Sequence, residues 1–363
     1  MSANPGSNTR KSGGARPSFF LHLHPPTIPL REARFRYTFG LGGLAVYLFL
    51  SLILTGALEL FYYVPSAEEA NASVQTLTFL VPFGWLVRAL HYWAAQALVV
   101  VCILHMLRVV LTGSYKPPRA FNWLLGVVLL VVVFFLDFTG YALRWDDRVA
   151  WAVLVGTNLI RSTPWVGEAM YATIVGGVQL GPAAVVRFYA WHIFGLALPG
   201  FGVLVWHLFR VRRDGGISNR ARVRGKLPTE ADITAPDRIP RSELLGREIL
   251  AALLATIALV VLSLALPPSL GGPIDLGKPP PEATAPWFFI WVQRLLRLGD
   301  PLLLGLGVPT ALLGLLLALP YVLDRSHAGA AVWFNREGRL AQGFVLSTLA
   351  LLCGLTLWGI LSS

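Results

Sequence analysis

The amino-acid sequence predicts an all-α integral membrane protein with about seven transmembrane helices, of which the first four form a bundle. Of its 363 residues, 55% are hydrophobic and only 13% are charged, whereas soluble domains carry about 25% charged residues. Seven apolar segments also reach the length of about 20 residues that a helix needs to cross a bilayer, and a helix satisfies its own backbone hydrogen bonds in lipid. The segments are 38–60, 85–111, 122–143, 187–210, 247–267, 301–323 and 341–361.

The basic residues predict the orientation of these helices. The net charge is +11, and Lys and Arg are concentrated in residues 1–37 and 210–247, while residues 58–87 contain neither. Because cytoplasmic loops are enriched in Lys and Arg, we expect a multi-pass protein of the cell inner membrane with a cytoplasmic N-terminus. This clustering beside apolar runs is typical of cytoplasmic loops, so no nucleic-acid partner is expected.

Polar segments divide the chain into four regions. Residues 1–37 are rich in Ser, Gly and Pro and are expected to form a flexible cytoplasmic tail. Residues 38–218 hold the first four spans, residues 219–246 are a polar cytoplasmic linker, and residues 247–363 hold the last three spans. The long segment 144–186 contains three tryptophans, which are enriched at membrane interfaces, so it predicts short helices at the outer surface.

Four histidines lie inside apolar spans, where an ionisable side chain is costly and usually functional. His91 and His105 on the second span are 105 − 91 = 14 residues apart, and His192 and His207 on the fourth are 207 − 192 = 15 apart. At about 100° per residue both separations return near one helix face, with roughly 21 Å along the axis between the first two rings. The two spans run in the same direction, so we expect His91 to face His192 near the outer surface and His105 to face His207 near the inner one.

Two opposed imidazoles suit the two axial positions of a heme iron. Two such pairs at matching depth predict two bis-histidine hemes stacked across the bilayer, which makes residues 38–218 a four-helix di-heme domain. His91 and His192 would bind the outer iron, and His105 and His207 the inner iron. The alternative is four unrelated histidines that bond backbone carbonyls or line a proton path in a non-redox transporter or channel.

Glycines on the first and third spans repeat this spacing. Gly42 and Gly56 are 56 − 42 = 14 residues apart, and Gly126 and Gly140 are 140 − 126 = 14 apart. A residue without a side chain lets a flat macrocycle approach the backbone closely, although small residues also serve helix packing in membranes. The spacing shared with the histidines favours the heme interpretation.

Three arginines lie near the histidines in the sequence. Arg88 and Arg187 precede the outer pair, and Arg108 follows His105 by about one helical turn. Each can pair with a heme propionate through charge-assisted hydrogen bonds. The alternative is an arginine that extends to the membrane surface.

Several segments resemble the cytochrome b/b6 family, the core subunits of quinol–cytochrome c and quinol–plastocyanin reductases. The resemblance is strong over residues 35–218 and weaker over 247–361, which is similar to a part that the b6 branch makes as a separate subunit. The 15-residue histidine gap also resembles the b6 branch. The segments are "RALHYWAAQALVVVCILHMLRVVLTGSYKPPR", "FTGYALRWDDRVAWAV", "RFYAWHIFGLALPGFGVLVWHLFRVRRDGGIS" and "GGLAVYLFLSLILTGALELFYYVPSAEEANASVQ".

The resemblance implies a quinol-oxidising site outside, a quinone-reducing site inside, and two b hemes between them. Arg212 matches a cationic position near the inner quinone pocket. In the family a Pro-Glu-Trp-Tyr motif precedes the sixth span, and its glutamate is thought to accept a quinol proton. Aligned on Trp287, this chain has Pro286 in the glutamate position and Phe288 in the tyrosine position. The remaining candidates for the outer quinol site are Asp146, Asp147, Glu282 and Trp287 itself.

Two further departures concern the outer pocket and a third heme. Arg144 and Trp145 replace the usual Pro-Trp after a leucine, which puts a cation beside the outer pocket. Gly40 stands where the b6 branch has a cysteine that tethers an additional heme, so no covalent third heme is expected.

The expected function is that of the cytochrome b subunit of a bc-type quinol oxidoreductase, with quinone as substrate and proton translocation. The resemblance also implies a homodimer. The two cysteines, Cys102 and Cys353, lie in spans, so a Rieske-type iron–sulfur protein and a cytochrome c or equivalent acceptor must be separate chains. The alternative is a di-heme membrane anchor of another respiratory reductase complex, without a standard outer quinol site.

Overall fold

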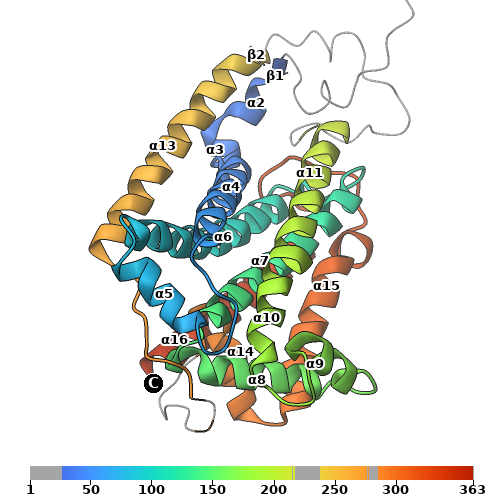
Figure 1. Cartoon of the computed structure of the whole chain (residues 1–363). Coiled ribbons are helices and arrows are strands. Elements are labelled where there is room, and N and C mark those ends of the chain that lie inside the picture. The colour runs from blue at the N-terminus through green and yellow to red at the C-terminus, as the bar shows by residue number, and fades with distance from the viewer. Residues whose placement is uncertain (1–26, 215, 217–237, 276, 278–284, 363) are drawn as a thin grey trace, which may run out of the picture.

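The structure, a computed structural model, describes residues 27–214, 216, 238–275, 277 and 285–362 (Figure 1). Within these residues seven helical segments are long and apolar enough to cross a membrane, which confirms the predicted all-α fold with seven spans. The spans are α4 (Leu41–Glu59), α6 (Gly84–Leu111), α7 (Ala120–Leu143), the composite Ala183–Arg213, α13 (Arg241–Ala265), the composite Pro301–Val322 and α16 (Arg339–Leu361).

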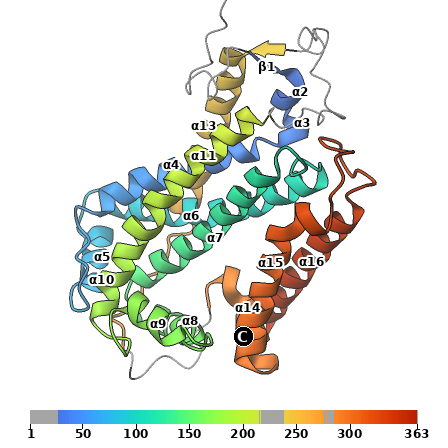
Figure 2. The same cartoon turned by 90° about the vertical axis from the view of Figure 1, so that its right-hand side faces the viewer.

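The first four spans pack in the order α4, α6, α7 and the composite fourth span (Figure 2). Leu48 of α4, Leu98 of α6 and Val133 of α7 are buried together in their core. Lipid tails are as apolar as leucine, so close contact between helices stabilises such a bundle more than burial from water does. The small Ala94 of α6, which is buried in the same cluster, permits this contact.

The fourth span is continuous but not uniform. It consists of α10 (Ala183–Ala190), the π-helical segment η2 (Trp191–Ala197) and α11 (Leu198–Arg213). A single π-helical turn accommodates an extra residue within a regular helix and is frequent at functional sites. The side chains that follow η2 are therefore rotated relative to an uninterrupted α-helix.

Short helices connect the spans. Helix α5 (Ala70–Phe79) lies between the first two spans. The segment 144–186 holds η1 (Asp147–Val149), α8 (Ala150–Arg161) and α9 (Gly167–Val175), as its sequence predicts. Val153 of α8 and Val175 of α9 are buried against Phe188 of α10, so these helices cover one end of the bundle.

The described residues extend into the expected tail and the expected linker. Strand β1 (Thr27–Pro29) pairs with β2 (Arg238–Pro240) in an antiparallel sheet, and the helices α2 (Leu30–Ala33) and α3 (Phe35–Thr38) follow β1. The physical reason is local burial, because Ile28 and Ile239 form a small apolar core with Ala33. The rest of the expected tail and linker lies outside the described residues.

The last three spans pack against the first bundle. Helix α13 contacts α4 and α6, α15 (Val308–Val322) contacts α7, and α16 contacts α6. The sixth span begins with η4 (Pro301–Gly307), and η3 (Trp287–Phe289) and α14 (Ile290–Leu298) precede it. Figure 2 shows α14, α15 and α16 grouped on one side of the molecule.

A buried ion pair joins the two parts of the chain. Lys116, in the loop after α6, lies 3.0 Å from Asp324 after α15, and neither side chain is exposed. Tyr115 donates a hydrogen bond of 2.5 Å to the same carboxylate. Burial, and then this hydrogen bond, raise the pKa of Tyr115, so the hydroxyl keeps the proton that it donates. Because both charges are desolvated, each depends on its partner.

Candidate functional site

The four span histidines lie on α6 and on the composite fourth span. His192 is within η2 and His207 is within α11. Because η2 accommodates about one extra residue, the 15-residue separation on this span corresponds to 15 − 1 = 14 regular positions and matches His91 and His105 on α6. The rings of His91 and His192 are close enough to interact electrostatically, as are those of His105 and His207. The structure therefore brings the histidines together in the two pairs that the sequence predicts.

Threonine hydroxyls orient both rings of the outer pair. Nδ1 of His91 is 2.9 Å from Oγ1 of Thr55, and that hydroxyl donates its own proton to the carbonyl of Ser51 at 2.8 Å. The hydroxyl therefore accepts from His91, and Nδ1 carries the ring proton. A neutral imidazole protonated at Nδ1 presents its lone pair at Nε2, the nitrogen free to bind a metal.

The second ring of the outer pair is held in the same way. Nδ1 of His192 is 2.9 Å from Oγ1 of Thr139, whose hydroxyl donates to the carbonyl of Phe135 at 2.8 Å. The two Nε2 atoms make no hydrogen bond to any described residue, and all four span histidines are only partly buried. The ring edges opposite the threonines are thus available to a ligand.

The inner pair differs from the outer pair. Nδ1 of His207 is buried near the backbone carbonyl of Asn122, and no side-chain hydroxyl among the described residues bonds to it. Arg108, one turn after His105 on α6, is itself buried, at 4% exposure. A buried cation is therefore close to this pair, whereas threonine hydroxyls hold the outer rings.

Each of the four spaced glycines lies against one imidazole. A Cβ atom at these positions would come within 3.0 to 3.4 Å of the ring carbon Cε1. The group that occupies the space above each glycine is thus a histidine ring, so the glycines allow α4 and α7 to approach the histidines closely. The pairs are Gly56 with His91, Gly140 with His192, Gly42 with His105, and Gly126 with His207.

The arginines have different surroundings. Arg88 is buried and donates to the carbonyls of Pro268 and Ser269. Arg108 donates through Nε to the carbonyl of Tyr37 at 3.1 Å, but its Nη2 is buried without a partner among the described residues. Arg187 is exposed. Arg108 is thus the arginine of the three with an unused buried donor.

Arg212, the predicted inner-pocket cation, lies 3.6 Å from the carboxylate of Glu32. Glu32 belongs to α2 and is buried, at 8% exposure. The segment before α4 therefore reaches the C-terminal end of α11, and the pair brings a cation and an anion together at this end of the bundle.

Of the three acidic candidates for the outer quinol site, the structure shows one, Asp146, to be engaged in other interactions. Asp146 is fully buried, forms an ion pair with Arg144, and accepts hydrogen bonds from the backbone of Gly271 at 3.0 Å and Val149 at 3.2 Å. Its oxygens are used to fix the loop after α7, and the cation at position 144 is neutralised there. Oδ1 of Asp147 is buried without a partner among the described residues, and Glu282 lies outside them.

Trp287 belongs to a chain of hydrogen bonds that was not predicted from the sequence. Its Nε1 donates to Oε1 of Gln96 at 2.6 Å, and Nε2 of Gln96 donates to Oδ1 of Asp137 at 3.2 Å. The chain joins η3, α6 and α7. The signal that could have revealed it is the lone carboxylate in the third apolar span, because an intramembrane acid is a functional candidate by default.

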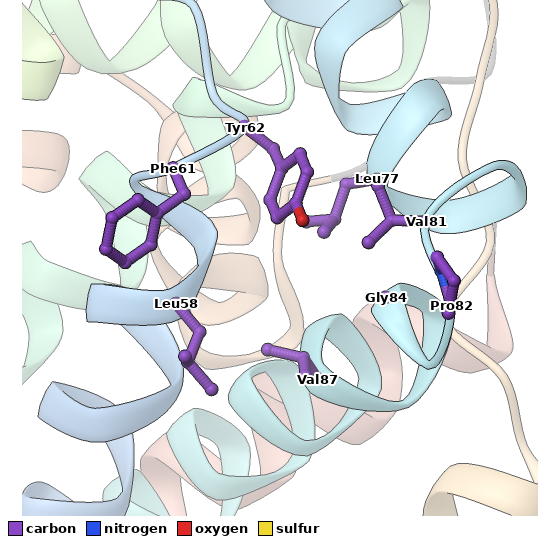
Figure 3. A pocket seen from close by; sticks show the side chains of 8 residues that line it. All are labelled: Leu58, Phe61, Tyr62, Leu77, Val81, Pro82, Gly84 and Val87. Atoms are coloured by element: carbon purple, nitrogen blue, oxygen red, sulfur yellow. The ribbon is translucent and has the colours of Figure 1, made fainter.

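Elsewhere, a hollow of about 430 Å³ lies between α4, α5 and α6 (Figure 3). Its wall is largely apolar, and it contains none of the residues predicted to form the site. The lining residues are Leu58, Phe61, Tyr62, Leu77, Val81, Pro82, Gly84 and Val87.

Comparisons with known proteins extend this geometry. The family described as "Cytochrome b/b6/petB" matches residues 30–215. Cytochrome b6 of Oltmannsiellopsis viridis is 41% identical over 175 residues, which cover 48% of this chain and 81% of that protein. Cytochrome b6 of Heliobacterium mobile is 42% identical over 175 residues, covering 48% and 82%.

A solved structure, "Hyperthermophilic respiratory Complex III", is similar to this chain with a TM-score of 0.74 and 25% sequence identity. The match covers 89% of this chain and 84% of the chain in that structure. The structural match therefore extends beyond residues 30–215. Together with the seven spans, these similarities confirm the predicted resemblance. The chain belongs to the cytochrome b/b6 family and is a multi-pass, b-heme-binding electron-transfer subunit of a bc-type, multi-subunit oxidoreductase complex that works with quinone.

Proposed function

We propose that this subunit carries electrons across the membrane through two b hemes, between an outer quinol-oxidising site and an inner quinone-reducing site. One observation supports this most: two pairs of imidazoles, each ring backed by a glycine, lie at two levels of one helix bundle. A non-redox transporter would not need the glycines at the same spacing. When bound, a b heme supplies an iron that takes up and releases one electron at a time.

The residues present fit this cofactor. His91 and His192 would hold the outer iron through Nε2, since the threonine hydroxyls engage Nδ1. His105 and His207 would hold the inner iron. The unpartnered Nη2 of Arg108 suits a propionate at the inner level, because charge-assisted hydrogen bonds are the strongest that a buried arginine can make.

The proposed cycle releases protons outside and takes them up inside. We assign the cytoplasmic side to the N-terminal end of the chain and the 211–240 region because both are rich in Lys and Arg. Cys102 and Cys353 lie on α6 and α16, both in spans, so the first acceptor of the outer site would be a Rieske-type protein on a separate chain. A cytochrome c or equivalent would accept electrons from it.

The heme assignment is tested by substitution in the purified complex. His192→Ala should lose the outer heme and His207→Ala the inner heme, so each variant should retain one heme where the wild type has two. Heme is quantified by the pyridine hemochrome spectrum and resolved by potentiometric titration. His327→Ala is the matched control, since His327 is exposed after α15. A variant of either ligand that keeps both hemes contradicts the assignment.

One observation favours a second candidate, a di-heme anchor of another respiratory reductase. Pro286 occupies the position of the proton-accepting glutamate of the family motif, and proline cannot accept a proton. Subunit composition separates the two candidates. A Rieske-type protein that copurifies in equal amount supports the bc-type complex, whereas a different redox partner supports the anchor.

A further inference from the structure

An intramembrane carboxylate is linked to Trp287 through Gln96, in a position that the family motif does not supply. Asp137 is on α7 and is only partly buried. Oδ1 accepts from Gln96, and no hydrogen bond to Oδ2 is formed by any described residue. A charged group in a span is costly, and such residues usually face a functional site. Gln96 thus holds one carboxylate oxygen of Asp137 by a hydrogen bond, and the other oxygen is available to a ligand.

The aromatic residues around Asp137 form a site suited to a flat ring. Phe134 and Phe138 flank Asp137 on the same face of α7, and both contact Phe289 with ring centroids 6.1 and 6.0 Å apart. Trp287, next to this cluster, remains 38% exposed. A hydroquinone has an apolar ring and two hydroxyl groups, so this combination of aromatic faces and a carboxylate matches its chemistry.

The carboxylate is also at the depth of the outer histidine pair. Asp137 precedes Thr139 by two residues, and Thr139 contacts His192. Gln96 follows His91 by five residues on α6. A quinol bound beside Trp287 would therefore be close to the outer pair, as transfer of its electron requires.

Other titratable groups do not replace Asp137 here. Tyr92 of α6 is near Asp137, but a neutral phenol is a far weaker base than a carboxylate. Arg144, at the end of α7, is paired with Asp146. The segment Trp287–Phe289 contributes no titratable side chain.

We propose that Asp137 is the proton acceptor of the outer quinol site, positioned by Gln96 and Trp287, in place of the motif glutamate. This rests on the proposed quinol-oxidising function. The O–H bond of the quinol breaks, the proton passes to a carboxylate oxygen of Asp137, and the bonding electron pair stays on the quinol oxygen.

The test is Asp137→Asn in the intact purified complex, with tetramethylhydroquinone as the probe. Asn keeps an oxygen that accepts from Gln96 but cannot take up a proton. Because a positioned general base contributes about 10²–10⁴-fold, kcat for quinol oxidation should fall at least about 100-fold, with KM and both heme spectra unchanged. The wild-type rate should rise with pH as the carboxyl group ionises, Asp137→Asn should lose this rise, and Asp137→Glu should restore it.

Glu59→Gln is the matched control, because Glu59 is another partly buried acid at the end of a span and outside the Trp287 chain. It should retain the wild-type rate. If Asp137→Asn keeps the wild-type rate and pH profile while the wild type oxidises quinol, the assignment of Asp137 is wrong. A wild-type complex that oxidises no quinol would overturn the proposed function as well.

Discussion

Alanine substitution of the four glycines gives a graded test of the histidine arrangement. A Cβ would lie 3.0 Å from the imidazole at Gly140, 3.1 Å at Gly56, 3.3 Å at Gly42 and 3.4 Å at Gly126. The shortfall from an ordinary contact of 3.4 Å is thus 3.4 − 3.0 = 0.4 Å at Gly140 and none at Gly126. The outer pair should therefore be more sensitive than the inner pair.

The energies follow from packing and hydrogen bonding. At Gly140 the added methyl costs about 1–3 kcal/mol of overpacking, and displacing the ring weakens the bond to Thr139, worth about 0.5–1.5 kcal/mol. Replacing glycine by alanine also stabilises the helix by about 1 kcal/mol at every site, because alanine has the higher helix propensity. The net loss at Gly140 is then about 0.5–3.5 kcal/mol, or roughly twofold to several hundredfold in outer-heme affinity, whereas Gly126→Ala should be neutral or stabilising.

The assay is heme retention in the purified complex during titration with apomyoglobin, which takes up released heme. The expected order of loss is Gly140→Ala, then Gly56→Ala, then Gly42→Ala, with Gly126→Ala equal to wild type. The reasoning is refuted if Gly126→Ala releases heme more readily than Gly140→Ala.

Two further substitutions test interactions outside the iron ligands. Lys116→Met leaves the Asp324 carboxylate buried without its cation, which costs about 3–5 kcal/mol, so the thermal midpoint of unfolding in detergent should fall. The double variant Lys116→Met/Asp324→Leu should regain most of the lost stability. A double variant as unstable as Lys116→Met would contradict the ion-pair explanation. Thr139→Val removes the hydroxyl that accepts a hydrogen bond from His192. In a redox titration the potential of the proposed outer heme should rise, while the potential of the inner heme should stay constant. An unchanged outer potential would show that the hydroxyl does not affect the basicity of His192.

Much of this architecture is predictable from the sequence because the membrane limits the choices. Seven apolar segments have to be helices, and an ionisable residue within them needs a reason to be there. The histidines therefore indicate a site by their positions in the sequence alone. The ordered segment from Thr27 to Thr38 was not predicted, because its stability comes from pairing with residues 238–240, which are far away in the sequence.

Other features depend on geometry that the sequence does not display. The π-helical turn at His192 explains why a 15-residue separation behaves like 14, and no residue in it marks such a turn. Asp146 and Asp137 are both aspartates near the C-terminal end of α7. Only the structure distinguishes Asp146, enclosed by Arg144 and two backbone amides, from Asp137, which shares a hydrogen-bond chain with Trp287.

The asymmetry of the two histidine pairs also gives the proposed electron path a direction. Hydrogen bonds from Nδ1 to Thr55 and Thr139 make the outer imidazoles more basic, so as ligands of the proposed outer heme they would favour its oxidised form and lower its potential. His207 has no such hydroxyl partner among the described residues, and the buried Arg108 lies one turn from His105. A buried positive charge favours the reduced iron, since the added electron offsets it. If two hemes are bound as proposed, these residues would favour electron transfer from the outer to the inner heme, which is the direction that the proposed quinol-oxidising and quinone-reducing sites require.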